Sequence, residues 1–450
     1  MNAPYTQQIA QFITTLDANP IPEAAKKMAL DAFADCVGVL IAGSDEEAVS
    51  IAASLSIPDN DGVPVICRGL QVRMEDAALI NGIAAHVLDY DDVGLSGHPS
   101  AVIVPAVLAL GAAINASGER AIRAYLVGFE TWGMIEGLDP LPLYKQGFHP
   151  TAIFGTVAAA GSCAYLLNLT AEQTANALAI ASSLASGLVA SFGTMTKPLH
   201  VGRAAQAGLL AARLASKGFT GSPDVFEHDS GFLLSHSPSR NPALDRVLRT
   251  GVPSVDWKAG AGVLNVKRYP VCYGAHRVID VVTELAIEHD LTTEDISSID
   301  VVTGDMQMVM LRNARPTTGL EAKFSMQFAI ASALAVRRCS LKELSDDFVT
   351  RDDIQSIFPR VSITTVGGSM PGLPFAPQEQ VKLTLSNGQV LERTVEFAKG
   401  SHQLPLDEIE LKDKFIDCAT TKLSEDNAAA LWLQLRCLAD LKSLRALILQ

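Results

Sequence analysis

Hydrophobic positions in the first half of the chain surround the expected helices instead of marking a single stripe. Up to about residue 215, Ala, Leu, Val and Gly recur at helical spacing, and polar residues rarely fill a whole face. A helix that is apolar on every side lies buried among other helices. The pattern therefore predicts an all-helical bundle, with helices over residues 20–43, 74–90, 99–116, 120–138, 150–169 and 170–191.

The pattern changes after residue 265, where strand-like alternation of apolar and polar positions begins. Asn387-Gly388, between alternating apolar residues, is typical of a β-hairpin turn. Helical spacing returns near the end, through residues 428–449. The expected elements between these points are a helix over 276–288, a strand over 296–304, an amphipathic helix over 321–338, and strands over 360–366 and 379–397.

These patterns predict a mainly α fold with three segments. A large all-helical domain is expected over residues 1–265 and a smaller α/β domain over 266–399. The remaining residues, 400–450, are expected to form C-terminal helices that return to the helical domain.

Composition excludes several classes of protein. A chain of 450 residues with 48% apolar content can build two or three domains with a large core. Its formal net charge of −14 argues against nucleic acid and anionic membranes as partners. No apolar run approaches the roughly 20 residues that span a bilayer, and the first residues lack the pattern of a signal peptide. We therefore expect a cytoplasmic protein.

The seven cysteines are scattered and form no C-x-x-C pair. This distribution suits a reducing compartment and argues against structural zinc or an iron–sulfur cluster. The sequence therefore predicts no metal site.

His98, His149 and Lys197 each stand directly before a proline that is expected to open an apolar helix. Proline is favoured at the first helical position, and the free N–H groups and dipole of that end attract anions. If the three helix starts converge, they would form a pocket for a polycarboxylate or a phosphate.

Acidic residues shortly before His98 supply the opposite charge. Asp89 ends an apolar segment, where an ionised carboxylate is costly unless it is paired or faces a cleft, so we interpret it as functional. The alternative is a structural partner for Asn81 or for a backbone donor. Asp91 and Asp92 are interpreted as capping or solvated residues of the same loop and stay outside the catalytic set.

Lys197, His200 and Arg203 fall three residues apart and share one face of a helix. Their surroundings are too apolar and small for an exposed basic stripe. We expect Lys197 to anchor a substrate carboxylate and His200 to orient it.

Six segments, in their order and spacing, resemble the MmgE/PrpD family, which includes 2-methylcitrate dehydratases, cis-aconitate decarboxylases and an iminodisuccinate epimerase. The segments are HVLDYDDVGLSGHPS, GFHPTAIFG, FGTMTKPLHVGRAAQAGLLAA, VKRYPVCYGAHRVID, EAKFSMQF and PLDEIELKDKF. The resemblance covers essentially the whole chain. It implies a large helical domain, a smaller α/β lid domain, a site between the two, a homodimer, and neither metal nor organic cofactor.

The resemblance also implies roles for individual residues. Those implied to be acid and base are Asp89, His98 and His149. Those implied to bind the substrate are Lys197, Lys267 and His276, while His200 joins them from its place on the helix face of Lys197.

Some residues depart from the family's decarboxylases. Phe328 stands where they have a tyrosine, and Val93 stands where they have a threonine, and the spacing from the aspartate to the first histidine is one residue shorter. These departures argue against decarboxylation. Tyr269, Cys272 and Tyr273 are interpreted as packing residues, with a phenol or thiol proton donor as the alternative.

The predicted function is a cofactor-independent lyase that acts on a small di- or tricarboxylic acid by abstracting a proton next to a carboxylate. Dehydration, as by a 2-methylcitrate dehydratase, is the favoured outcome. The alternatives are an epimerase of an iminodisuccinate-like dicarboxylate and a cis-aconitate decarboxylase-like enzyme. A non-catalytic binding protein is a further alternative, but it gives no reason to keep costly ionisable groups in apolar surroundings.

Overall fold

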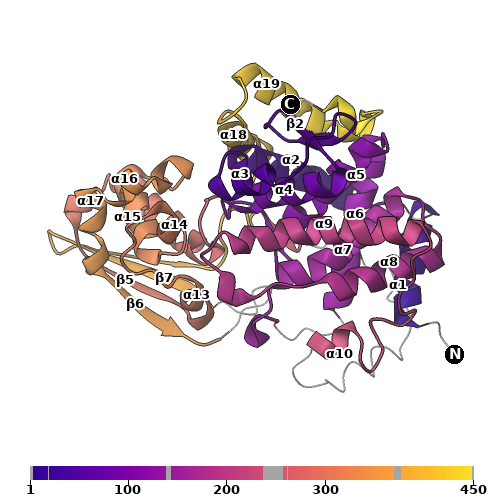
Figure 1. Ribbon diagram of the computed structural model, residues 1–450. Helices are drawn as coiled ribbons and strands as arrows, with labels where there is room; N and C mark the ends of the chain where they lie inside the picture. Colours follow the sequence, from indigo (N-terminus) through magenta and orange to yellow (C-terminus); the bar gives the residue numbers. More distant parts are fainter. Residues whose placement is uncertain are drawn as a thin grey trace. The chain divides into compact units, whose positions relative to one another are not determined.

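The computed structural model describes residues 4–18, 20–137, 143–236, 257–260, 262–368 and 377–447 (Figure 1). The chain divides into two compact units. The first combines Met1–Asn265 with Asp407–Gln450, and the second is Val266–Leu406. Within the described residues, none of the helices has the length and apolar character needed to cross a membrane.

Helices make up nearly all of the regular structure in the first unit. Its α-helices are α1 (Tyr5–Thr15), α2 (Glu23–Gly43), α3 (Glu47–Ser54), α4 (Met74–His86), α5 (Pro99–Ala113), α6 (Gly118–Glu136), α7 (Pro150–Leu166), α8 (Ala171–Leu184), α9 (Thr196–Ser216), α10 (Phe232–His236), α18 (Glu408–Ala419) and α19 (Glu425–Arg436). Its 3-10 turns are η1 (Leu16–Ala18), η2 (Leu143–Gln146), η3 (Val189–Ser191), η8 (Leu438–Asp440) and η9 (Leu444–Ala446). Two small antiparallel ladders join β1 (Val63–Val65) to β2 (Leu70–Val72), and β3 (Val93–Gly94) to β4 (Leu264–Asn265). The predicted mainly α class is confirmed.

Close packing of α4, α7 and α9 forms the centre of this unit (Figure 1). Every residue of α7 is buried, as expected for a helix that is apolar on all sides. A Cβ atom at Gly202 in α9 would lie 2.1 Å from the carbonyl oxygen of Leu79 in α4. Glycine is therefore needed where these two backbones meet. The contact holds the N-terminal half of α9 close to α4.

Two of the three expected helix starts are fully confirmed. His98 and His149 are the N-cap residues of α5 and α7, with proline at the first helical position of each. The third helix also starts where expected, with Lys197 in its first turn, but α9 begins at Thr196, so that Pro198 is its third residue and not its first. Proline is tolerated there because the first four N–H groups of a helix have no partner within the helix.

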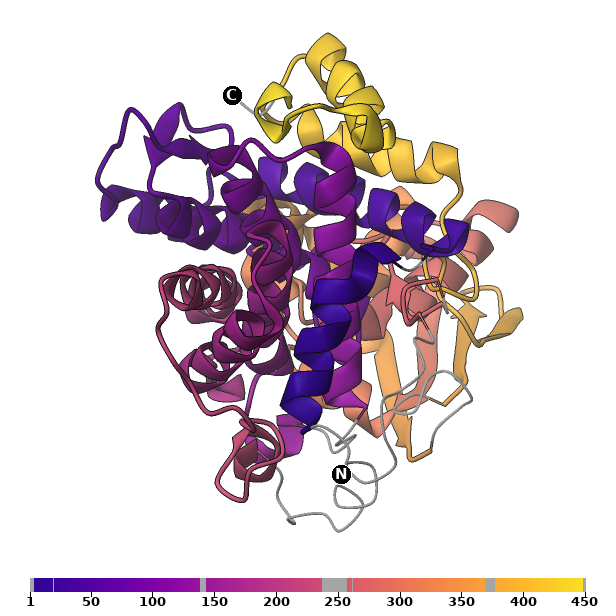
Figure 2. The same ribbon diagram turned by 90° about the vertical axis from the view of Figure 1, so that its right-hand side faces the viewer.

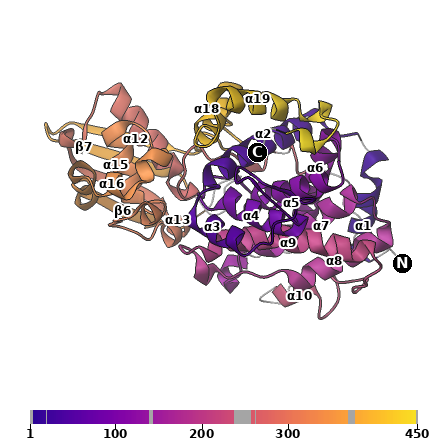
Figure 3. The ribbon, with the colours of Figure 1, turned by 45° about the horizontal axis from the view of Figure 1, so that its top comes forward.

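The C-terminal helices pack against the N-terminal part of the same unit. α18 lies against α2, and α19 lies against both (Figure 3). Figure 2 shows the same segment in yellow beside the first helices. A Cβ atom at Gly38 in α2 would lie 3.0 Å from the ring of Phe415 in α18, so these two helices also approach closely. Residues far apart in the sequence therefore share one core.

The second unit is an α/β unit built on a four-stranded mixed sheet. The sheet order is β6-β5-β7-β8, with β5 and β6 parallel and the other pairs antiparallel. The strands are β5 (Ile296–Gly304), β6 (Val361–Val366), β7 (Glu379–Leu385) and β8 (Val390–Val395). The helices are α12 (His276–Glu288), α13 (Asp305–Met310), α14 (Gly319–Ala322), α15 (Met326–Val336), α16 (Asp346–Val349) and α17 (Asp352–Gln355). The 3-10 turns are η4 (Tyr273–Ala275), η5 (Thr293–Asp295), η6 (Leu341–Leu344) and η7 (Phe358–Arg360).

Local sequence signals fix several of these elements. The helix expected over 276–288 and the strand expected over 296–304 are confirmed, and β7 pairs with β8 through the expected hairpin, with Gly388 at φ 86°. The single helix expected over 321–338 is wrong, because α14 and α15 are separate. Between them the Ser325 side chain accepts a hydrogen bond from the Phe328 N–H and starts the second helix as its N-cap.

Candidate active site

The site begins with the loop of residues 87–98 between α4 and α5. Asp89 lies in this loop with φ 53°, in the left-handed region of the backbone. Aspartate and asparagine adopt this conformation more readily than most residues. The N–H of Asp89 donates to the carbonyl of His86 at 3.0 Å, which closes the turn that follows α4.

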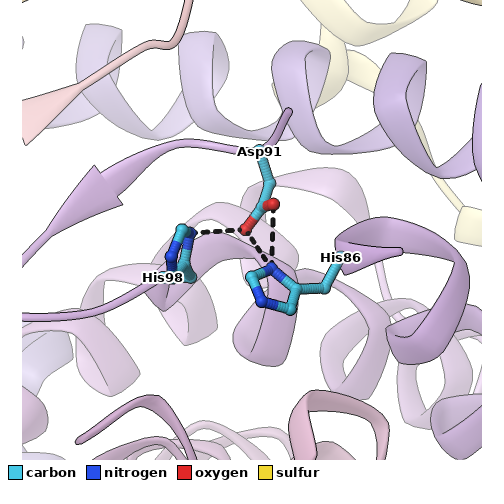
Figure 4. Close-up of side chains that lie close together, drawn as sticks. All are labelled: His86, Asp91 and His98. Atoms are coloured by element: carbon cyan, nitrogen blue, oxygen red, sulfur yellow. Dashed lines mark hydrogen bonds and ion pairs between the residues drawn. The ribbon is translucent and has the colours of Figure 1, made fainter. Parts of the chain in front are cut away.

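Asp91 lies between two histidine side chains (Figure 4). His86 Nδ1 is 2.9 and 3.1 Å from the two carboxylate oxygens of Asp91, and His98 Nδ1 is 2.9 Å from one of them. His98 Nδ1 is also 2.9 Å from the carbonyl oxygen of Asp92. The three side chains are buried. One carboxylate therefore orients two imidazole rings.

Charge and burial set the protonation of this group. Burial alone would raise the pKa of Asp91, but the two imidazoles hold it well below its usual value. Burial, together with the nearby Lys197 and His98, lowers the pKa of His86 to about 4, against the opposing effect of Asp91. At neutral pH, Asp91 is therefore ionised and His86 is neutral. His86 Nε2 has no hydrogen-bond partner among the described residues.

Asp89 and Lys197 form a buried ion pair. Lys197 Nζ donates to Asp89 Oδ1 at 2.6 Å, and it also lies 5.3 Å from the ring centroid of Phe192. Asp89 is not the partner of Asn81, because the Asn81 side-chain oxygen accepts from the backbone N–H of Ile66 and its amide donates to the carbonyl of Pro64. The close packing of α4 and α9 brings these two residues together from positions 108 apart.

His149 and His200 form a second imidazole pair. Their Nδ1 atoms are 3.2 Å apart, so one ring donates and the other accepts. Burial lowers the pKa of both histidines, and Lys197 lowers both further. His149 Nε2, like His86 Nε2, has no hydrogen-bond partner among the described residues. The ring centroids of His86 and His149 are 6.3 Å apart, which connects the two imidazole groups.

These seven side chains form what we call the ionisable cluster: His86, Asp89, Asp91, His98, His149, Lys197 and His200. Five of them are expected from the sequence, and the structure brings these five together. His86 and Asp91 were missed as site residues. Their spacing within HVLDYDDVGLSGHPS was a usable signal, because a histidine that ends a helix can meet a carboxylate in the following turn.

Asp91 and Asp92 are not the solvated residues that one interpretation expected, although Asp92 does accept from the first turn of α5 as a capping residue would. Both are fully buried. Asp91 holds two imidazoles, and one oxygen of Asp92 accepts from the Ser100 N–H at 3.4 Å near the start of α5. Burial and the neighbouring Asp35 raise the pKa of Asp92 well above its usual value. The sequence could not show this burial, because it depends on tertiary packing, which includes a hydrogen bond from the distant Lys414 to Tyr90 of the same loop.

Lys267 and His276 belong to the second unit. Both are buried, and His276 Nε2 lies 3.2 Å from the carbonyl oxygen of Val271. The ring of His276 contacts those of Tyr269 and Tyr273, with centroids 5.2 and 5.0 Å apart. Their part in substrate binding stays a prediction.

Tyr269 and Cys272 lie in the hydrophobic core of the second unit. The Tyr269 hydroxyl donates to Asp280 at 2.6 Å. These contacts agree with the interpretation of both residues as packing residues.

The donor types of His86, Asp91 and His98 would also suit a divalent first-row metal. One ligand atom from each lies within 4.8 Å of the others. Hydrogen bonds of 2.9 Å from the two Nδ1 atoms to the carboxylate already account for this spacing. A metal would have to replace the protons in both bonds, so the expectation of a metal-free site stays a prediction.

Comparison with known proteins gives consistent matches along the chain. Residues 7–245 match the MmgE/PrpD N-terminal domain, and residues 269–440 match the MmgE/PrpD C-terminal domain. The chain is 26% identical to human cis-aconitate decarboxylase, over 97% of this chain and 92% of that protein. It is 27% identical to the mouse cis-aconitate decarboxylase, over 81% and 76%, and 26% identical to that of Aspergillus terreus, over 79% and 77%.

Proposed function

Because the chain belongs to the MmgE/PrpD family, we propose that it is a cofactor-independent lyase that acts on a small di- or tricarboxylic acid. The observation that carries the proposal is the buried Asp89–Lys197 pair, whose ammonium lies close enough to His86, His149 and His200 to lower their pKa values. A base, a cation and proton carriers in one buried place are what proton abstraction next to a carboxylate requires.

In this proposal the substrate opens the ion pair. A substrate carboxylate takes over the ammonium of Lys197, and Asp89 is released to act as the base. Asp89 accepts the proton from the carbon next to that carboxylate, and Lys197 stabilises the negative charge that develops on the carboxylate oxygens. Binding and activation of the base are thereby coupled.

Dehydration completes the reaction when a hydroxyl group leaves the neighbouring carbon. His98 or His149 gives a proton to the departing oxygen, so that water leaves and a carbon–carbon double bond forms. Asp91 holds the ring of His98 through Nδ1, and His200 holds that of His149 in the same way. Lys267 and His276 would bind further carboxylates of the substrate.

Decarboxylation is the second candidate, and the similarity to cis-aconitate decarboxylases supports it. Phe328 and Val93 argue against it. They stand where the decarboxylases of the family have a tyrosine and a threonine, so the phenol and the hydroxyl group of those two residues are missing here. Phe328 is fully buried in the core of the second unit. Epimerisation requires the same proton abstraction, followed by reprotonation on the other face. A homodimer and a cytoplasmic location remain part of the proposal.

A proton-exchange screen in deuterated water tests the shared chemistry. The purified chain is incubated with a panel of di- and tricarboxylates, and NMR follows deuterium incorporation and product formation. We expect deuterium at a carbon next to a carboxylate, with an alkene product if dehydration follows. Tight binding of a polycarboxylate without any exchange or product would support a binding protein instead.

A further inference from the structure

Lys414 in α18 reaches the loop that carries the site, although it comes from the C-terminal part of the first unit. It belongs to the PLDEIELKDKF segment, for which the proposed function has no role. Its ammonium group forms an ion pair with Asp35 of α2 at 2.5 Å and donates to the carbonyl oxygen of Tyr90 at 2.9 Å. It also lies 4.0 Å from the ring centroid of Tyr90.

The position of Lys414 is fixed by the packing of its helix. α18 begins with a capping box between Asp407 and Glu410. The next residue, Phe415, packs against α2 at Gly38 and against the ring of Trp432 in α19. Lys414 itself is 8% exposed. A lysine held in this way acts as a fixed donor and not as a mobile surface charge.

Lys414 also balances the acidic groups near the loop. Asp35 and Asp92 are buried; Asp35 raises the pKa of Asp92, and Asp91 raises the pKa of Asp35. Burial raises the pKa of Asp35, and Lys414 counteracts this rise. Without Lys414, the loop would lose the positive charge that α18 places next to it. It would also lose the hydrogen bond to the carbonyl of Tyr90, the residue between Asp89 and Asp91.

We propose that Lys414 is a positioning residue that holds Asp89 and Asp91 in their working geometry by fixing Tyr90 between them. The inference rests on the proposed function for its kinetic consequence. Asp89 needs a left-handed backbone, and such a conformation persists only when its surroundings determine it. The bond from Lys414 to the adjacent residue supplies that constraint.

A purely structural role for Lys414 would differ in one respect. If Lys414 serves only to neutralise Asp35, then removing both charges together should restore both the stability of the protein and the structure of the loop. If it positions the loop, the double change should restore stability but not the loop, because the donor to the Tyr90 carbonyl is still missing.

The test compares Lys414→Met, the double variant Asp35→Asn/Lys414→Met, and the control Lys412→Met, which changes an exposed lysine of the same helix. Amide hydrogen exchange of residues 87–98, measured by mass spectrometry, reports the loop without requiring any substrate. Proton-exchange kinetics with the carboxylate found in the screen report kcat and KM.

We expect faster amide exchange of this loop in Lys414→Met and in the double variant, and wild-type exchange in Lys412→Met. The double variant should unfold at the wild-type denaturant midpoint, while kcat stays about 10- to 100-fold low, the scale of a small misplacement of catalytic groups. Wild-type loop protection or wild-type kcat in the double variant would overturn the proposal. If no carboxylate reacts with the wild type, the proposed function fails, and the amide exchange alone still decides the positioning role.

Discussion

The site loop meets two buried lysine–aspartate pairs, and the two pairs differ in what surrounds them. Asp89 of the first pair directly precedes Tyr90, and Lys414 of the second pair donates to the Tyr90 carbonyl. Lys197–Asp89 has a separation of 2.6 Å, with side-chain exposures of 9% and 8%. Lys414–Asp35 has a separation of 2.5 Å, with exposures of 5% and 0%. The chemical groups are the same and the distances are nearly equal.

The surroundings decide what each pair can do. Near Lys197 lie imidazoles, and two of their Nε2 atoms have no hydrogen-bond partner among the described residues. Near Lys414 lie an aromatic ring and a backbone carbonyl that the ammonium already contacts. In the proposed function the first ammonium exchanges its carboxylate for one from a substrate, whereas the second stays bound to Asp35 and Tyr90. The proposal therefore assigns a functional role to one ion pair and a structural role to the other according to their neighbours.

The largest expected effect is on the carboxylate of the first pair. Asp89→Asn keeps the shape and tolerates the left-handed backbone, but it removes the basic oxygen. Proton exchange in deuterated water should fall by about 100- to 10,000-fold, the range of general-base catalysis, with little change in substrate binding. The exposed Asp61→Asn serves as a control. Undiminished exchange in Asp89→Asn would assign the base to a histidine.

The corresponding change in the second pair should affect folding instead. Asp35→Asn leaves a buried ammonium without its carboxylate, and breaking a buried pair in this way costs about 3 to 5 kcal/mol of unfolding free energy. Denaturant unfolding measures the loss. Asp45→Asn breaks a pair with Lys422 in which both residues are more exposed, and it should cost at most about 1 kcal/mol. Equal losses in the two variants would remove the distinction between the buried and exposed pairs.

The cation of the first pair should matter for both binding and turnover. Lys197→Ala removes the charge that neutralises the substrate carboxylate, and kcat/KM should fall by the equivalent of about 2 to 4 kcal/mol. Steady-state kinetics separate the two contributions, since kcat should fall along with affinity. Lys217→Ala, at the exposed end of α9, is the matched control. A change in KM alone would limit Lys197 to ground-state binding.

Mild acid should lower the free energy of unfolding through His86, which lies near the first pair. His86 has a pKa of about 4 in the folded chain, against 6.5 as its ordinary value. Between these values the unfolded chain takes up a proton that the folded chain does not, so the free energy of unfolding falls as pH falls, by up to about 3 kcal/mol for this group. His86→Gln should show a shallower slope of stability between pH 6.5 and 4. Parallel curves for the two proteins would contradict this assignment.

The smallest expected effect is that of metal removal. Lys197 balances the negative charge of Asp89, and two hydrogen-bonded imidazoles hold the carboxylate of Asp91. These carboxylates do not need a metal ion, so activity should survive dialysis against EDTA. Activity assays before and after chelation measure this. Loss of activity that one divalent metal restores would instead identify His86, Asp91 and His98 as metal ligands.

Local patterns predicted the elements and part of the cluster. Apolar residues on all sides of α7 predicted its burial, and the prolines after His98 and His149 predicted the two helix starts, because these signals lie within a few residues. Asp89, His98, His149, Lys197 and His200 could be chosen from residue types and from the family resemblance.

The remaining features depend on contacts between distant residues. Asp91 looks like a loop carboxylate until the structure shows it buried between His86 and His98, and Lys414 looks like one of several lysines in a charged helix. The break before Met326 depends on a serine cap that competes with a continuous helical pattern. Such features follow from tertiary packing, which a hydrophobic pattern does not specify.

The discontinuous first unit has a consequence for biosynthesis. Asp407–Gln450 belongs to the same unit as Met1–Asn265, and the whole second unit is translated between them. Domains generally fold as they emerge from the ribosome, but Lys414 is made only after the whole second unit, so its contacts with Asp35 and Tyr90 form after that unit has been translated. A chain interrupted before α18 would carry most of the helical core and every residue of the ionisable cluster, yet it would expose the face of α2 to chaperones and proteases instead of closing it.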